Sequence, residues 1–180
     1  MTATGQRTAD SYTRTAKSLH WLVAFLIPCA LTMGWTMVNL GVSPLKVKMF
    51  NWHKWLGICI LLLVTIRSGW RLTHPPPAMV PMPRWQSVSA HGLHVLLYVL
   101  MFAQPLSGWA YSNATGYPIV LFGLLRLPDL VGKSKPLAAS LDAMHIALGW
   151  LLFSCIILHV LAALQHHFIV RDGTLRRILQ

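Results

Sequence analysis

The sequence predicts an all-α protein, a four-helix transmembrane bundle that forms one domain over residues 1–180. Hydrophobic residues make up 55% of the chain and charged residues 11%, whereas soluble domains carry roughly 25% charged residues. The apolar residues gather in four long stretches, each close to or above the roughly 20 residues that cross a bilayer as a helix. A length of 180 residues suits a single domain. Composition and patterning therefore both indicate a multi-pass membrane protein.

The four predicted helices cover residues of about 19–41, 53–73, 90–111 and 143–168. The first is longer than the roughly 7–15 apolar residues of a signal peptide and contains Pro28, so we expect it to stay in the protein. The proline run at 75–77 ends the second helix, because successive prolines cannot continue it. Pro105 indicates a bend in the third helix. The fourth helix follows the longest connector, residues 112–140.

The basic residues flank the predicted helices. The formal net charge of +11 invites a nucleic-acid partner, yet the fifteen lysines and arginines lie almost entirely between or at the ends of the apolar stretches. Membrane flanks explain this pattern better, so we expect lipid contact and no nucleic acid. Nine lie on the side of the termini and six on the other: Arg7, Arg14, Lys17, Arg67, Arg71, Arg84, Arg171, Arg176 and Arg177 against Lys46, Lys48, Lys54, Arg126, Lys133 and Lys135. The positive-inside rule then predicts both termini in the cytoplasm.

Four histidines lie within or at the ends of these helices. His145 and His159 are fourteen residues apart, which in a helix is about 1400° and 21 Å, so both side chains leave one face at opposite depths. His20 opens the first helix on the side of the termini, and His53 opens the second on the other side. The fourth helix enters from that other side. The spacing therefore predicts that His20 lies level with His159, and His53 level with His145.

A histidine in a membrane segment is costly, so it normally faces the bundle interior and has a function there. We interpret the two pairs as axial ligands of two haem irons, because a bundle core is a usual place for such cofactors. One alternative is four separate histidines, each satisfied by a hydrogen bond at a helix end. Another is a zinc or copper site, but such ions need several ligands around one centre. The chain has no Cys-x-x-Cys-His motif, so a haem would be held noncovalently.

Three of these histidines, together with His94, stand in four longer motifs: Ser18-Leu19-His20-Trp21, His53-Lys54-Trp55-Leu56-Gly57, Gly92-Leu93-His94-Val95-Leu96-Leu97-Tyr98, and Leu158-His159-Val160-Leu161-Ala162-Ala163-Leu164-Gln165-His166-His167-Phe168. The pattern covers nearly the whole chain and resembles the bacterial cytochrome b561 family, which overlaps the membrane cytochrome b subunits of nickel-iron hydrogenases. By that similarity, the haem b ligand positions are His20, His53, His145 and His159. The resemblance implies a diheme, quinone-linked electron carrier of the bacterial inner membrane. Some members resemble superoxide oxidases, which pass electrons from superoxide to ubiquinone.

Further candidate contacts surround the predicted ligands. Arg67 lies fourteen residues after His53, on the same face, and Arg71 follows one turn later. An arginine this close to the hydrophobic zone needs a partner or must reach the membrane surface, and a haem propionate would be such a partner. His94 is a candidate for a quinone or propionate contact, with an ordinary interfacial histidine as the alternative. We expect loop, interface or helix-capping roles for the rest: His74, His91, His166 and His167.

Two axial histidines leave iron no open position, which favours outer-sphere electron transfer over oxygen chemistry. We therefore expect a diheme b-type cytochrome that moves electrons across the inner membrane between a small reductant, such as superoxide, and ubiquinone. A second hypothesis is a cytochrome b membrane subunit that passes electrons between a soluble donor protein, a partner dehydrogenase, and quinone. A third, of another class, is a small transporter whose histidines carry protons or metal ions. The transporter hypothesis predicts a colourless protein.

Overall fold

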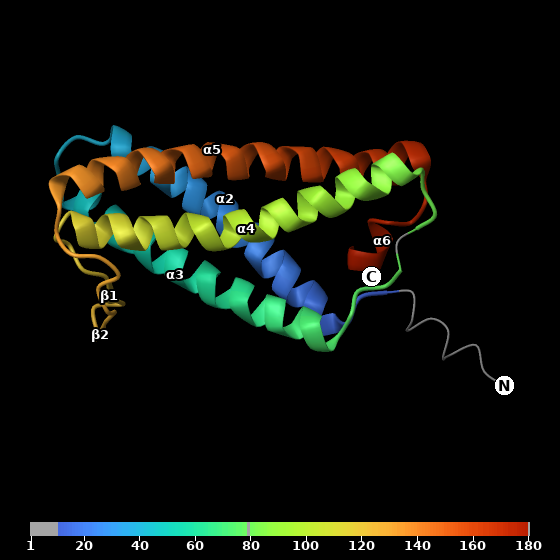
Figure 1. Cartoon of the computed structure of the whole chain (residues 1–180), viewed down its shortest axis with the longest axis horizontal. Coiled ribbons are helices and arrows are strands. Elements are labelled where there is room, and N and C mark those ends of the chain that lie inside the picture. The colour runs from blue at the N-terminus through green and yellow to red at the C-terminus, as the bar shows by residue number, and fades with distance from the viewer. Residues whose placement is uncertain (1–10, 79, 180) are drawn as a thin grey trace.

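The computed structural model describes residues 11–78 and 80–179, and four long helices dominate it (Figure 1). Their bounds are α2 Arg14–Asn39, α3 Pro44–Thr73, α4 Arg84–Ala114 and α5 Lys135–Gln165. All four are long and apolar enough to cross a membrane, the last one with its continuation to Val170. The prediction of an all-α bundle of four membrane-spanning helices is confirmed.

The helices begin earlier than hydrophobicity alone predicts. They start at Arg14, Pro44, Arg84 and Lys135, rather than near residues 19, 53, 90 and 143. Capping explains three of these starts, because a side-chain oxygen accepts a hydrogen bond from a first-turn amide at Thr13, Ser43 and Ser134. α3 also carries proline in its first turn, where the missing N–H costs nothing. The polar first turns therefore extend each helix beyond its apolar stretch.

The connector between α4 and α5 contains a small β-hairpin. Strands β1 Val120–Leu121 and β2 Leu125–Arg126 pair antiparallel, and Gly123 takes a φ of +75° in the turn between them. The indole nitrogen of Trp55, in the first half of α3, donates to the Val120 carbonyl at 2.7 Å. The hairpin is therefore fixed to the end of the bundle where α3 begins. We call this the hairpin end.

The opposite end, the terminal end, holds the start of α2 and the C-terminal segment 166–179 (Figure 1). α5 passes into a π-helical turn, η1 His166–Val170, and a short helix follows, α6 Arg176–Leu179. The predicted fourth helix to residue 168 thus changes its hydrogen-bond pattern after Gln165. The indole nitrogen of Trp21 on α2 donates to the Ile178 carbonyl at 3.0 Å, which holds α6 against α2.

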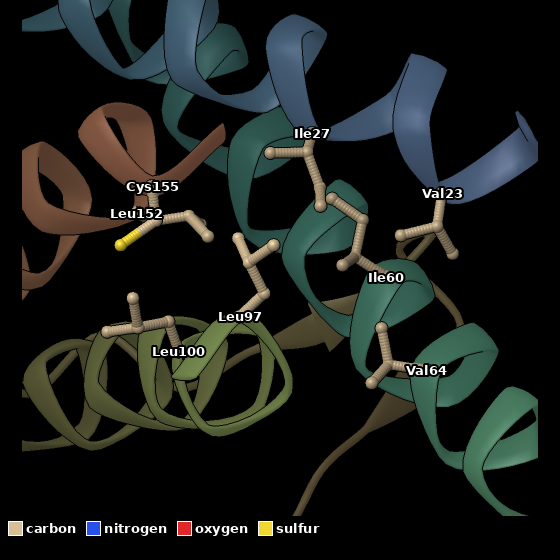
Figure 2. Packing of buried hydrophobic residues seen from close by; sticks show 8 residues of the cluster. All are labelled: Val23, Ile27, Ile60, Val64, Leu97, Leu100, Leu152 and Cys155. Carbon is tan, nitrogen blue, oxygen red and sulfur yellow. The ribbon is translucent and has the colours of Figure 1, made fainter. Parts of the chain in front are cut away.

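The core lies between the two ends. Each helix contributes two buried residues spaced three or four apart, which places them on one helix face. They are Val23 and Ile27, Ile60 and Val64, Leu97 and Leu100, and Leu152 and Cys155 (Figure 2). In α5, Leu152 and Cys155 fall between His145 and His159. An apolar layer therefore separates the two predicted histidine levels.

The outer surface of the bundle is apolar. Phe25, Leu62 and Leu158 are 67%, 60% and 58% exposed, as are many other large hydrophobic side chains on the same helices. Exposed apolar surface of this extent marks a membrane or protein contact. On helices long enough to cross a bilayer, lipid is the environment that this surface fits.

Candidate functional site

Three histidines meet at the terminal end of the bundle. The ring centres of His20 on α2 and His159 on α5 lie 6.3 Å apart, with an angle of 67° between the ring planes. This is the pair expected from depth alone. His94 on α4 joins them, its ring centre 5.2 Å from that of His159. His20 and His159 are half-buried, whereas His94 is exposed.

The second expected pair lies at the hairpin end. The ring centres of His53 on α3 and His145 on α5 are 6.2 Å apart, and the rings are perpendicular. Both histidines line a mostly apolar cavity that opens in part to the surroundings. Gln104 on α4 lines the same cavity, with its amide nitrogen 3.4 Å from Nε2 of His145. Ser107 Oγ lies 2.9 Å from Nδ1 of the same ring.

Two glycines make room for the imidazoles at the hairpin end. A Cβ on Gly108 of α4 would lie 2.8 Å from Cε1 of His145, closer than real contacts allow. A Cβ on Gly34 of α2 would lie 3.2 Å from Cε1 of His53. In both places the ring of one helix therefore packs directly against the backbone of a neighbouring helix.

The geometry of the pairs suits a haem. A metal–imidazole bond of about 2 Å, with the ring centre about 1 Å beyond the nitrogen, puts two rings on either side of one iron roughly 6 Å apart. Across the described residues, no group of three or more His, Cys, Asp or Glu could hold a bare metal ion. A tetrapyrrole supplies four ligands of its iron itself, so the protein needs to supply only the remaining ones. At the hairpin end, two polar atoms that belong to cavity-lining residues are buried without a hydrogen-bond partner: Nδ1 of His53 and Oε1 of Gln104.

The similarity of the whole sequence to known proteins identifies its family. Residues 11–180 match the family model described as prokaryotic cytochrome b561. The chain belongs to this family. It is 33% identical to cytochrome b561 homolog 2 of Escherichia coli K12 over 176 residues, which cover 96% of this chain and 93% of the relative. It is 35% identical to the probable superoxide oxidase CybB of Yersinia pestis over 167 residues, 89% and 91% of the two chains.

A third relative, cytochrome b561 homolog 1 of Escherichia coli K12, is 28% identical over 177 residues, which cover 94% of this chain and 97% of the relative. As a member of the cytochrome b561 family with four apolar spans, the chain is a multi-pass bacterial membrane protein that transfers electrons. Membership also implies b-type haem binding, with lipid as the surrounding medium.

The other basic candidates of this cytochrome gather at the terminal end. Arg67 donates from Nε to the Tyr98 hydroxyl at 3.0 Å and from an NH group to the Ala16 carbonyl at 2.8 Å. The Arg71 guanidinium lies 5.7 Å from the centre of the Tyr98 ring. Both arginines line a second cavity, together with Trp70. Arg67 also interacts electrostatically with all three histidines of this end.

Three of the four remaining histidines have local contacts. His74 stacks on Trp70 with ring centres 3.9 Å apart, as a loop histidine next to the proline run can. His166 pairs with Asp172 across the π-helical turn, which is a more specific contact than the helix capping we expected. His167 packs against the ring of Phe168 at 4.7 Å.

Sequence reasoning did not identify Gly34, Gln104 or Ser107 as site residues. Signals for them existed in the chain. Gln104 and Ser107 are polar residues three apart in an apolar stretch, so they share a helix face. Gly34 stands inside a predicted helix, where glycine costs about 1 kcal/mol relative to alanine, and such a position often marks a close approach.

Proposed function

We propose that this chain is a diheme b-type cytochrome, one domain throughout, that carries electrons across the bacterial inner membrane between a small reductant and ubiquinone. The observation that carries the proposal is the pair of imidazoles at each end of the bundle, with ring centres 6.3 and 6.2 Å apart. His20 and His159 would hold the haem iron at the terminal end. His53 and His145 take the same role at the hairpin end.

When bound, haem supplies one-electron iron redox chemistry. The chain's own residues do the rest. Two imidazoles at each site would hold the iron from the protein, which would favour outer-sphere electron transfer over oxygen binding. The apolar core layer keeps water from the space between the sites. Along α5, His145 and His159 are separated by about 21 Å, most of the roughly 30 Å hydrocarbon thickness, so the two sites together span the membrane.

The polar groups of the terminal end suit the edge of a haem. Arg67 is a positive charge held beside His20, His94 and His159 by the Tyr98 hydroxyl and the Ala16 carbonyl. We assign it, with Arg71, to haem propionates, because a guanidinium binds carboxylates in a fixed fork geometry. His94 is exposed next to His159, so it can donate to a quinone carbonyl or to a propionate.

The terminal end faces the cytoplasm in this proposal. The chain carries nine basic residues on that side and six on the other, and the positive-inside rule favours the richer side for the cytoplasm. One of the nine, Arg7, lies outside the described residues. With this orientation, His53 and His145 lie near the periplasmic face, where a small reductant arrives.

Superoxide is the candidate reductant, because the chain is similar to a protein named as a probable superoxide oxidase. The test is to supply superoxide to the purified single chain in detergent with a ubiquinone analogue, and to follow haem reduction and quinol formation. We expect quinol to form, and superoxide dismutase to stop it. Haem that stays oxidised until a second protein is added would contradict the proposal and favour the role of a membrane subunit for a dehydrogenase.

A further inference from the structure

The hydrogen bonds around His145 determine which of its ring nitrogens carries the proton. The Ser107 hydroxyl donates its single hydrogen to the Gln104 carbonyl at 2.8 Å. Its oxygen therefore faces Nδ1 of His145, 2.9 Å away, as an acceptor. Nδ1 must then carry the ring hydrogen, and in a neutral imidazole Nε2 is left with a free lone pair.

The second polar neighbour agrees with this tautomer. The side-chain amide nitrogen of Gln104 is a donor, and it lies 3.4 Å from Nε2 of His145. The contact at Nε2 thus agrees with the proton position that the Ser107 contact sets at Nδ1. With the hydrogen on Nδ1, Nε2 has the lone pair that can bind a metal in place of the Gln104 amide.

We infer that Ser107 is a positioning residue for the haem at the hairpin end, which it tunes through His145. This inference rests on the proposed function. A metal-bound histidine whose second nitrogen donates to an acceptor is fixed in orientation and becomes a more basic ligand. A more basic ligand stabilises ferric over ferrous iron, so the Ser107 contact lowers the reduction potential of this haem.

Burial strengthens the effect of this contact. Ser107 is 4% exposed, and a hydrogen bond away from water is electrostatically stronger than an exposed one. The opposite ligand has no side-chain contact of this kind, since Nδ1 of His53 is buried without a hydrogen-bond partner and the neighbour of that ring is the Ala30 backbone. At the hairpin end, Ser107 is therefore the side chain through which the basicity of His145 can be tuned, next to the Gln104 backbone. Gly108, the next residue, lets the ring come this close.

The test is a potentiometric titration of the full chain, purified with haem, followed by visible absorption. In Ser107→Ala we expect one haem to shift to higher potential and the other to stay unchanged. A tenfold decrease in the equilibrium preference for ferric over ferrous iron corresponds to a rise of about 59 mV in the reduction potential. Ser107→Cys keeps the shape of the side chain, with a somewhat larger atom that is a weaker acceptor, so we expect a smaller shift in the same direction. Ser154→Ala is the matched control, because that hydroxyl bonds only its own helix at the Trp150 carbonyl and is exposed.

Wild-type potentials for both haems in Ser107→Ala and Ser107→Cys would overturn the inference. If the alanine variant holds no haem at the hairpin end, the cysteine variant alone tests the inference. Wild-type potentials for both of its haems would then overturn it. His145→Ala separates this result from failure of the proposed function. A His145→Ala protein that keeps both haems would show that the ligand assignment itself is wrong, whatever the serine variants do.

Discussion

At the scale of single residues, small side chains decide whether the histidines can face a cofactor. Gly108 and Gly34 let two imidazoles lie against the backbone of neighbouring helices. Neither glycine has a positive φ, so close approach, and not turn formation, explains them. Glycine inside a helix costs about 1 kcal/mol relative to alanine. The space that it leaves for His145 or His53 offsets this cost.

Gly108→Ala tests this role. The added Cβ would lie 2.8 Å from Cε1 of His145, so the ring must move or the helices must separate, at a cost of about 1–3 kcal/mol. We expect the variant to lose most of the haem at the hairpin end, measured as haem per protein. Gly92→Ala is the control on the same helix, since nothing lies within 4 Å of its added Cβ. Equal haem content in the two variants would contradict the role of Gly108.

The ligand pairing makes a separate prediction. His20→Ala and His159→Ala should remove the same haem, and His53→Ala and His145→Ala the other, because each pair lies at one end of the bundle. Reduced-minus-oxidised spectra of the four variants would show two classes, each with one haem signal left. The pairing is wrong if His20→Ala and His145→Ala leave the same spectrum.

The histidine pairs could be predicted from the sequence because they depend only on helix direction and on rise per residue. The contacts of Ser107 and Gly108 could not. They depend on how far each helix rotates about its axis and how closely α4 approaches α5, and residue spacing along one helix contains neither quantity. His94 shows the same limit, since its approach to His159 is a contact between two helices.

At the scale of elements, the C-terminal segment closes the terminal end. Arg177 donates to the Ala78 carbonyl at 2.6 Å, and Trp21 to the Ile178 carbonyl at 3.0 Å. Asp172 fixes the turn that leads there, by accepting from the Thr174 amide at 2.9 Å and pairing with His166. Burial would raise the pKa of Asp172, but the hydrogen bonds from Thr174 and His166 outweigh it and hold the pKa below the ordinary value of 3.8.

Because the pKa of Asp172 is lowered in the folded state, its contribution to stability depends on pH. Because the folded state holds the Asp172 pKa below its unfolded value, its contribution to stability is fully present above about pH 3.8 and is lost as the pH falls through the folded pKa. Asp172→Asn removes the charge, so we expect roughly threefold to tenfold faster hydrogen exchange in segment 174–179 at pH 7. The difference should shrink below pH 3.8. Asp129→Asn, at the exposed pair with Arg126, is the control, and equal exchange in the two variants at pH 7 would contradict the role of Asp172.

Apolar length predicted where the helices cross the membrane, because the bilayer sets that length. It could not predict where they begin outside it. Those starts depend on the local chemistry of Thr13, Ser43 and Ser134, whose oxygens accept first-turn amides. The π-helical turn after Gln165 was also beyond prediction, because it goes with a left-handed Arg171 and the His166 pair with Asp172, which form only in three dimensions.

At the scale of the whole molecule, an apolar layer separates two histidine levels, and the residues around the histidines differ between the two ends of the bundle. The terminal end has three clustered histidines, and Arg67 and Arg71 line a cavity at the same end. At the hairpin end two histidines and a glutamine line a mostly apolar cavity, and Ser107 contacts one of these histidines. Two sites that differ this much should hold their irons at different potentials. A difference between the two potentials would then give electron flow across the membrane a preferred direction.

The orientation of the bundle is testable with reporters. We expect a fluorescent protein fused after residue 180 to fluoresce, because it folds in the cytoplasm, the side proposed for the terminal end from its excess of basic residues. A reporter that is active only in the periplasm should work when fused within the connector 127–134 at the hairpin end. The opposite pattern in both fusions would reverse the proposed direction.

The most direct test of the central claim is the number of haems per chain in detergent-purified protein, with oxidised and reduced absorption spectra. The two histidine pairs predict two b-type haems, both low-spin and six-coordinate in either oxidation state. One haem per chain would contradict the diheme assignment. A colourless protein, made with adequate haem supply, would contradict the cytochrome function itself and favour histidines that carry protons or ions.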